Sequence, residues 1–287
     1  MQISTTIKAL TRAVLPVDAL LVCYYKAAGR RPWGRGYVQY KQRELSRALN
    51  DQALLQQFRL SAPLPPGYGW RLDERIVEYP WTISRLRPGH EAVLDAGSTL
   101  NFQYLLDLPT IACKSVVTFT LAPEGVHSRE NVSYLYGDLR ETFFKDACFD
   151  TIVCISTLEH VGMDNNLLYS TNAQFREDRR EDYLIVIAEL WRVLRPGGQL
   201  LLTVPYGRSG GHGWFQQFDE EMVERVIATF APSRREKTYY KYSAEGWNVS
   251  DAEACAQCEY FDIHAATVPN GDGAAAARAV ACVQLVK

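Results

Sequence analysis

From His90 onward, apolar runs alternate with helical patterns, and this alternation constrains the fold more than any other feature of the sequence. The stretch REDYLIVIAELWRVL has apolar residues at helical spacing. Other runs are rich in β-branched residues and end at turns, namely AVLDAG, SVVTFTLA, VSYLYGD and FDTIVCIS. Strands that alternate with helices predict a parallel sheet with helices on both faces. We therefore expect an α/β fold.

The second half of the chain continues this pattern. The Arg195–Gly198 segment (RPGG) predicts the end of a helix, and QLLLTVPYG predicts the strand that follows. The stretch from Phe218 predicts a further helix with Asp219 as its N-cap. EKTYYKYS predicts a strand, Ala244 to Gly273 an irregular segment, and the run from Ala279 a final strand.

Residues 1–88 differ from the rest. A helical pattern from Tyr40 to Phe58 precedes the Pro- and Gly-rich stretch SAPLPPGYGW, and Leu72 to Leu86 predicts another short helix. Nothing in this segment alternates like a sheet strand. We interpret residues 1–88 as an N-terminal helical lid and residues 89–287 as the core domain.

Composition limits the possible partners and location. The net charge of −2 gives no electrostatic support to nucleic-acid binding, although it does not exclude a local basic patch. The apolar run Leu15 to Tyr25 is too short for a membrane span, contains Asp18 and lacks the cleavage pattern of a signal peptide. The seven scattered cysteines predict free thiols in a reducing compartment. We therefore expect a cytoplasmic protein.

The stretch VLDAGSTLN has a strand followed by Asp95 and Gly97 at a turn. In a doubly wound sheet, ligands bind beyond the carboxyl ends of the strands, where the strand order reverses. The turn therefore fits a cofactor site, although an empty relic of one or an ordinary strand–turn–helix would look similar.

Taken in order, VLDAG, GDLRE, FDTIVCISTLEHVG and ELWRVLRPGGQLLLTVP resemble the class I S-adenosylmethionine-dependent methyltransferases, in particular their small-molecule members. The resemblance covers about Ala92 to Pro205. It implies a doubly wound, Rossmann-like sheet of about seven strands, the last antiparallel, with S-adenosylmethionine as cofactor. It also places an acceptor-side insertion at about residues 206–278.

The resemblance implies a role for several residues. The backbone around Asp95, Gly97 and Ser98 would lie against the methionine moiety of the cofactor. Asp138, followed by Leu139, would lie by the adenine, although an Asp after a strand also simply forms turns. Ser156 and Thr157 would face the sulfonium.

Two departures from the family pattern put the cofactor site in doubt. The first loop has one glycine followed by STLN, so Ser98 or Asn101 would have to replace a backbone contact. Thr120 stands where an acidic residue usually binds both ribose hydroxyls, and Glu124 is the candidate substitute.

Two histidines are candidate bases for removing a proton from an acceptor. His160 follows Glu159 after the strand FDTIVCIS, and in many members of the family this Glu-His pair is structural. A Glu-x-x-Glu-His metal set is incomplete because Ser156 holds its first position, so we expect no metal. His212 lies in RSGGHGWFQQF, which would close over an acceptor or be an ordinary glycine loop.

Two further patterns have competing interpretations. Glu78 to Trp81 (EYPW) would cap the cofactor, or would pack as ordinary core. Cys255, Cys258 and His264 have the spacing of half a zinc site, but no second pair lies at a suitable distance, so we interpret the cysteines as semi-buried thiols.

The sequence therefore predicts methyl transfer from S-adenosylmethionine, at an oxygen of a small-molecule or carbohydrate acceptor. The first alternative is a non-catalytic binding or scaffold protein with an impaired cofactor site. The second is a nicotinamide dehydrogenase, which would need a G-x-G-x-x-G turn that the chain lacks.

Overall fold

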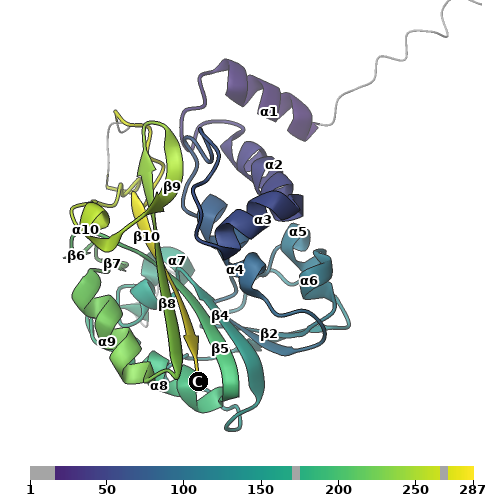
Figure 1. Ribbon diagram of the computed structural model, residues 1–287, viewed down its shortest axis with the longest axis vertical. Coiled ribbons are helices and arrows are strands. Elements are labelled where there is room, and N and C mark those ends of the chain that lie inside the picture. The colour runs from purple at the N-terminus through teal and green to yellow at the C-terminus, as the bar shows by residue number, and fades with distance from the viewer. Residues whose placement is uncertain (1–16, 170–174, 266–270) are drawn as a thin grey trace, which may run out of the picture.

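The computed structural model describes residues 17–169, 175–265 and 271–287. The first sixteen residues of the predicted lid, and residues 266–270 of the predicted insertion, lie outside these ranges. A single twisted sheet of eight strands runs through the described part of the chain (Figure 1). Its strands, in spatial order, are β3 (Val132–Tyr136), β2 (Ser115–Thr120), β1 (Ala92–Ala96), β4 (Phe149–Ile155), β5 (Leu194–Pro205), β10 (Ala279–Val286), β8 (Arg234–Ser243) and β9 (Gly246–Ser250).

The direction of the strands matches the predicted α/β fold, which is confirmed. Strands β3, β2, β1, β4 and β5 pair in parallel. Strand β10 is antiparallel to both β5 and β8. The chain order reverses between β1 and β4, so the carboxyl ends of these two strands form the edge where a doubly wound sheet binds ligands. The short strands β6 (Gly210–Gly211) and β7 (Gln216–Gln217) make a separate hairpin.

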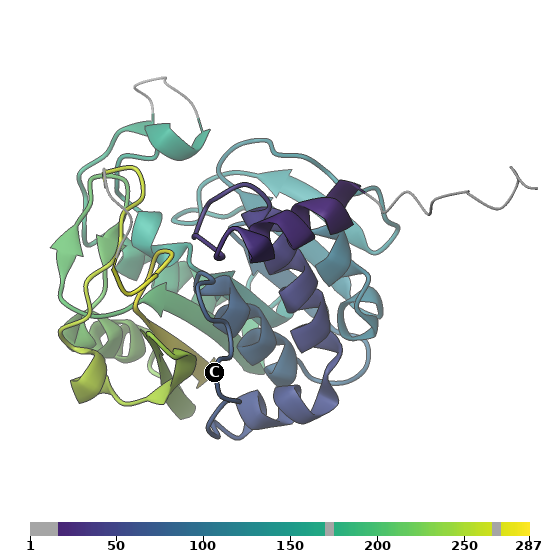
Figure 2. The same ribbon diagram turned by 90° about the horizontal axis from the view of Figure 1, so that it is seen from above.

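Helices cover both faces of the sheet because successive strand residues point to opposite sides. On β1, Val93 belongs to the core beneath the N-terminal helices, and Leu94 belongs to the core beneath the later ones. Figure 2 shows the purple and blue N-terminal helices grouped together, with the green and yellow segments beside them. The N-terminal helices are α1 (Val17–Ala27), α2 (Tyr37–Asn50), α3 (Gln52–Arg59) and α4 (Arg75–Arg85).

The opposite face is covered mainly by α8 (Tyr183–Val193) and α9 (Glu220–Phe230). As predicted, α9 begins at Asp219, whose side chain accepts a hydrogen bond from the Met222 amide (3.0 Å). The remaining helices are short: α5 (Gln103–Leu106), α6 (Pro109–Ala112), η1 (Leu158–His160), α7 (Asn166–Tyr169) and α10 (Ala252–Cys255).

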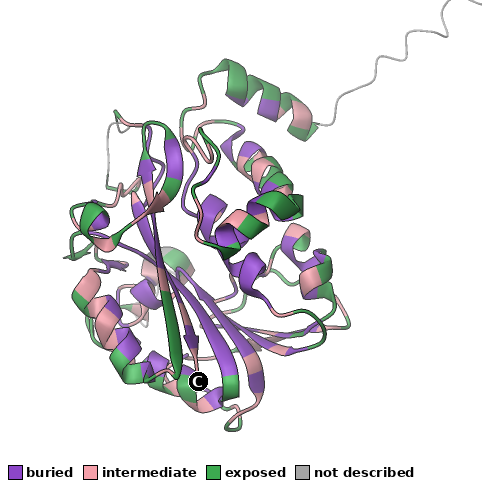
Figure 3. Ribbon diagram, in the orientation of Figure 1, coloured by how far each residue is buried: buried purple, intermediate pink, exposed green. Residues whose placement is uncertain are grey.

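Helix α4 lies inside the molecule, and every residue from Ile76 to Arg85 is buried, which Figure 3 shows in purple. The run Ala274 to Ala277, part of the one low-complexity patch, is buried as well. Its small side chains allow close packing, and the Trp33 indole donates a hydrogen bond to the Ala275 carbonyl (2.6 Å). These contacts join the N-terminal helices to the segment just before β10.

Local predictions had different outcomes. The helical pattern from Tyr40 to Phe58 is confirmed, as two helices, because the Asp51 carboxylate caps a new one by accepting from the Ala53 and Leu54 amides (both 3.0 Å). As predicted, α8 ends just before RPGG, at Val193, but β5 begins earlier than predicted, at Leu194, and its pairing with β4 shifts register. The irregular segment contains β9 and α10, and β9 raises the strand count of the sheet from seven to eight.

Candidate functional site

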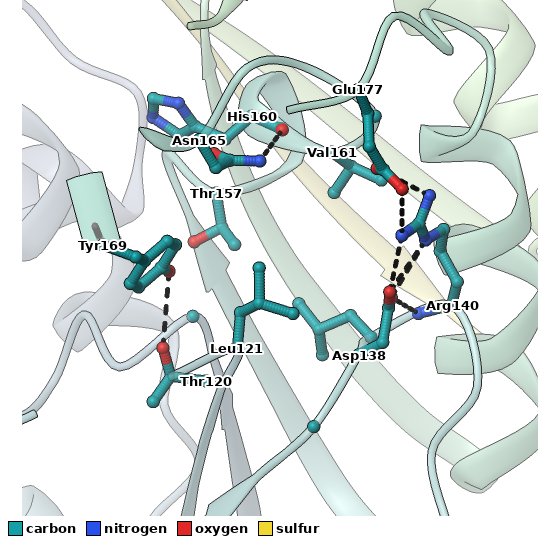
Figure 4. A pocket seen from close by; sticks show the side chains of 14 residues that line it. Thr120, Leu121, Asp138, Arg140, Thr157, His160, Val161, Asn165, Tyr169 and Glu177 are labelled. Carbon is teal, nitrogen blue, oxygen red and sulfur yellow. Dashed lines mark hydrogen bonds and ion pairs between the residues drawn. The ribbon is translucent and has the colours of Figure 1, made fainter. Parts of the chain in front are cut away.

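A pocket opens at the carboxyl ends of β1 to β4, the edge where the strand order reverses. Figure 4 shows Thr120 and Tyr169 on one side, Asp138, Arg140 and Glu177 on the other, and Thr157 between them. The pocket is lined by Gly97, Thr120, Leu121, Gly137, Asp138, Leu139, Arg140, Thr157, His160, Val161, Gly162, Asn165, Tyr169 and Glu177. Six residues selected from the sequence are among them: Gly97, Thr120, Asp138, Leu139, Thr157 and His160.

The turn after β1 approaches the turn after β4 so closely that only glycine fits at position 97. Gly97 has φ 108°, in the left-handed region, and a Cβ added there would lie 2.1 Å from Thr157 Oγ1. The Gly97 amide donates to the Phe119 carbonyl (2.8 Å). The single glycine of the loop therefore stands where the backbone needs it.

The rest of the loop is held by the carboxylate of Asp95, which is fully buried. It accepts hydrogen bonds from the amides of Thr99 and Leu100 (both 3.0 Å) and from the Thr99 hydroxyl (3.2 Å). Burial raises the pKa of Asp95 to about 7, although these hydrogen bonds oppose the rise. The side chain thus shapes the loop from behind and does not line the pocket.

Two polar residues of the loop have other surroundings. Ser98 adopts φ 61°, and its hydroxyl is buried without a hydrogen-bond partner among the described residues. Asn101 bridges to the segment after β2: its amide nitrogen donates to the Gly125 carbonyl (2.7 Å), and its amide oxygen accepts from the Tyr134 hydroxyl (3.0 Å). Neither side chain lines the pocket.

At the end of β2, Thr120 donates a hydrogen bond from its hydroxyl to Glu124 Oε1 (3.1 Å). The Tyr169 hydroxyl lies 3.5 Å from the same Thr120 oxygen. The bond brings the exposed Glu124 carboxylate to the strand end where the family pattern expects an acid.

The opposite wall of the pocket is an ion-pair network centred on Arg140. Its guanidinium contacts Asp138 (2.6 Å), Glu177 (2.9 Å) and Asp182 (2.6 Å). Burial alone would raise the pKa of Asp138, but the hydrogen bonds from Arg140 outweigh it and lower the pKa. The Asp138 carboxylate is therefore ionised at neutral pH and already accepts hydrogen bonds from the Arg140 guanidinium.

The two hydroxyl residues after β4 point in different directions. Thr157 lines the pocket, and its hydroxyl donates to the Ile155 carbonyl (2.9 Å). Ser156, with φ 38°, instead donates to Glu78 Oε1 (2.6 Å), which also accepts from the Thr203 hydroxyl (2.7 Å).

Glu78 also forms an ion pair with Arg75, and its side chain is fully buried. The predicted cofactor contacts Glu78 and Ser156 are therefore bonded to each other, away from the lining of the pocket.

His160 lies at the border of the pocket and is held by two contacts with Trp214. Its Nδ1 is 3.0 Å from the Trp214 carbonyl, and the two rings stack with centroids 5.1 Å apart. A carbonyl only accepts hydrogen bonds, so in the neutral tautomer Nδ1 carries the proton and Nε2 keeps its lone pair. Burial lowers the pKa of His160 to about 4, and the ring is therefore neutral at pH 7.

His212 belongs to the same aromatic cluster but not to the lining of the pocket. Its ring stacks on Phe215 (4.4 Å between centroids), and Phe215 also contacts the His160 ring (6.1 Å). Its Nδ1 lies 4.0 Å from Asp262 Oδ2. Burial lowers the pKa of His212, against the pull of Asp262. The structure thus brings the two candidate bases to one cluster.

Sequence reasoning missed several residues of the site. Arg140 belongs to the GDLRE segment, and its position two residues after Asp138 is the sequence feature that could have indicated an ion pair between them. Tyr169 lies in α7, whose sequence carries no motif. Glu159 was seen only as half of a Glu-His pair, yet Oε2 of its buried carboxyl has no partner among the described residues, and burial raises its pKa to about 8.

Cys255 and Cys258 are both free and buried, more deeply than the semi-buried prediction. Within residues 17–169, 175–265 and 271–287, no group of three His, Cys, Asp or Glu side chains is placed to hold a metal ion. In the same ranges, no helix has the length and apolar character that crossing a bilayer requires.

The geometry agrees with the sequence match. Residues 94–202, fewer than half of the chain, match a family model described as a methyltransferase domain. Together with the strand order and the pocket at the β1–β4 edge, this match identifies residues 94–202 as a methyltransferase domain with a doubly wound, Rossmann-like sheet. S-adenosylmethionine is the cofactor of this domain. No curated protein matches the sequence.

Several solved structures are similar to parts of this chain at low sequence identity. BH2331 from Bacillus halodurans C-125 is 15% identical, with 72% of this chain and 96% of that chain covered and a TM-score of 0.45. YcgJ from Bacillus subtilis is 14% identical, with the same coverage and a TM-score of 0.43. The 1,6-didemethyltoxoflavin-N1-methyltransferase of Burkholderia thailandensis, which holds S-adenosylhomocysteine, is 15% identical, with 69% and 72% covered and a TM-score of 0.41.

Proposed function

We propose that this protein transfers the methyl group of S-adenosylmethionine to an oxygen of a small-molecule or carbohydrate acceptor. The observation that carries the proposal is the contact between Gly97 and Thr157, because it joins the first turn of the domain to the strand end beside His160. A cofactor bound over this contact would have its reactive end next to the aromatic cluster.

The lining residues suggest how the chain would hold the cofactor. The backbone at Gly97 and Ser98 would lie against the methionine moiety. Glu124, brought to the end of β2 by Thr120, would accept from the ribose hydroxyls. Asp138 and Leu139 would flank the adenine, and Asp138 would share its acceptor capacity between the exocyclic amine and Arg140.

The bound cofactor supplies an electrophilic methyl group on a sulfonium. The protein's part is to align the acceptor and to remove its proton as the oxygen–carbon bond forms and the sulfur–carbon bond breaks. Nε2 of His160 is the atom we assign to that proton, because Nδ1 is held by the Trp214 carbonyl. His212, in the same aromatic cluster, would be the second candidate base. The aromatic faces of Trp214 and Phe215 support a ring-shaped acceptor such as a sugar.

We place the acceptor between two additions to the domain. Residues 1–88 would form the cap, and residues 206–278 would form the acceptor-side insertion that carries His212 and the aromatic cluster. The cap would be a fixed wall, because buried Glu78 links α4 to Ser156 and Thr203. The seven free cysteines support a cytoplasmic location.

A second candidate function is non-catalytic binding by a methyltransferase-like scaffold. Two observations favour it: Thr120 is uncharged at the ribose position, and the Asp138 carboxylate is already occupied by Arg140. It predicts no binding of the cofactor by the folded protein.

Calorimetric titration of the full chain with S-adenosylmethionine, S-adenosylhomocysteine and NADH separates these functions. Micromolar binding of the first two, without NADH binding, supports the enzyme. Thr157→Val should weaken that binding, whereas Thr110→Val, a substitution outside the pocket, should not. Absence of binding by a well-folded sample would favour the scaffold.

A further inference from the structure

Helix α1 exposes an apolar face to solvent. Val17, Leu20 and Tyr24 are 72%, 52% and 55% exposed, and their spacing of i, i+3 and i+7 places them on one side of the helix. The buried residues Val22 and Tyr25 lie on the other side, against α2. In Figure 3, α1 is largely green and lies at the edge of the molecule. A helix that is apolar on both sides needs a second apolar environment.

The same part of the chain collects positive charge. Residues 17–41 contain five basic residues and one acid, Asp18, for a net charge of +4. The whole chain has −2, so the remainder carries −6. Within the segment, Lys41 is paired with Asp73 (2.6 Å), whereas Lys26, Arg31 and Arg35 are exposed. Lys26 turns toward the Tyr40 ring (5.5 Å) on the other side of α1, so Arg31 and Arg35 are the cations available near the exposed apolar face, in an otherwise acidic protein.

Two aromatic side chains complete this surface. Trp33 is 43% exposed and is held in place by its hydrogen bond to the Ala275 carbonyl. The Arg35 guanidinium lies 5.8 Å from the centre of the Tyr24 ring. Tyr24 suits the boundary between lipid headgroups and acyl chains because one end of its ring is apolar and the other is polar, whereas Trp33, whose N–H is bonded within the protein, adds only apolar surface.

We propose that residues 17–35 dock onto the surface of an anionic lipid bilayer. Val17, Leu20 and Tyr24 enter the headgroup–acyl boundary, and Arg31 and Arg35 contact lipid phosphates. Helix α1, with 11 residues, lies in the plane of the surface and does not cross it. A purely apolar protein partner would leave Arg31 and Arg35 without counter-charges, whereas an anionic leaflet satisfies both parts of the surface.

Co-sedimentation of the full chain with vesicles tests the proposal, independently of any methyl transfer. We expect binding to vesicles of phosphatidylcholine mixed with phosphatidylglycerol, reduced binding at high salt, and little binding to phosphatidylcholine alone. Equal binding to the two kinds of vesicle, or no binding to either, would overturn it.

Matched variants assign the binding to this surface. Leu20→Gln combined with Tyr24→Gln, and separately Arg31→Glu, should each lower the partition coefficient roughly tenfold. Ile185→Gln, on an exposed apolar residue of α8 (50% exposed), and Lys145→Glu should leave it unchanged. All these residues are exposed, so the unfolding temperature should stay the same. An equal loss in the control variants, or light scattering that shows a dimer dissociated by the Leu20 variant, would contradict the proposal.

Discussion

The pocket at the β1–β4 edge and the buried polar cluster at α4 are built on different principles. The pocket is made of strand ends and turns, and the neighbouring sequence places each residue at such an end, as with Gly97 after β1 and Thr157 after β4. The polar cluster joins Arg75 and Glu78 of α4 to Ser156 and Thr203, which lie 78 and 125 residues from Glu78 in the chain. We call the first the local region, and the second, which joins segments far apart in the chain, the chain-specific region.

This difference suggests a division of function. The local region fits a common cofactor, whereas the chain-specific region and the aromatic cluster fit an acceptor that differs between proteins of one fold. Breaking contacts in the first region should affect cofactor binding, and breaking those in the second should affect the stability of the cap.

The strongest test of the local region is Gly97→Ala. The new Cβ would overlap the Thr157 side chain, and φ 108° is strained for alanine. We expect S-adenosylmethionine affinity to fall about 100-fold or more, equivalent to ~2.7 kcal/mol, measured by calorimetry. Gly89→Ala is the control, because Gly89 also has positive φ (84°) but no atom within 4 Å of an added Cβ. Undiminished affinity in Gly97→Ala would show that the cofactor binds elsewhere.

The chain-specific region is tested by Glu78→Gln. Removing the buried charge leaves Arg75 without its ion-pair partner and disturbs the hydroxyl donors Ser156 and Thr203. We expect the free energy of unfolding to fall by about 3 kcal/mol, measured by denaturant titration. Glu44→Gln, which removes the exposed i,i+3 ion pair with Arg47, should cost less than about 0.5 kcal/mol. Similar losses in both variants would mean that the cap is not anchored through Glu78.

The same contrast explains what could be predicted from the sequence. The alternation of strands and helices follows from local sequence patterns, whereas the doubly wound sheet and its final antiparallel strand were implied by the resemblance to the methyltransferases. Of the predicted site residues, those at strand ends, such as Thr120, Asp138 and Thr157, line the pocket. Asp95 and Asn101 do not, because their side chains hydrogen bond within and between loops, which no spacing in the sequence reveals.

The residues that were missed depend on tertiary contacts. The Tyr169 hydroxyl contacts Thr120, which lies 49 positions earlier in the chain. Arg140 donates hydrogen bonds to Glu177 and Asp182, which lie in later segments. The split of the predicted helix at Asp51 was readable in principle, because an Asp followed by a helical pattern is a common N-cap. The RPGG motif follows the end of α8 as predicted, but the strand begins at Leu194 and not at Gln199, because β5 continues irregularly through the motif.

Between these two regions lies His160, and its titration is a third test. Its pKa is about 4 in the folded protein and near 6.5 in the unfolded chain, because burial disfavours the imidazolium. As the pH falls, the unfolded chain therefore binds a proton at this histidine before the folded protein does. The stability that the neutral imidazole contributes is fully present above pH 6.5 and is lost as the pH falls toward 4. The loss attributable to His160 should be roughly 3 kcal/mol.

His160→Gln removes that titration, so the stability of the variant should depend less on pH between 6.5 and 4 than that of the wild type. His90→Gln, at the amino end of β1 where the side chain is exposed, is the matched control. Parallel pH profiles for the wild type and the His160 variant would show that the imidazole is not held neutral, and the assignment of its Nε2 as the base would lose its support.

The smallest expected effect concerns the ribose end of the pocket. If Glu124 replaces the missing acid, Glu124→Gln should weaken S-adenosylmethionine binding about fivefold, because a charge-assisted hydrogen bond becomes a neutral one. Thr120→Val should act in the same direction by releasing the Glu124 carboxylate from the end of β2. Glu130→Gln, an exposed acid in the same loop region, should have no effect. Calorimetric affinities that are equal across all three variants would mean that the ribose is held without a carboxylate, so the cofactor pocket, too, would depart from the pattern of its family.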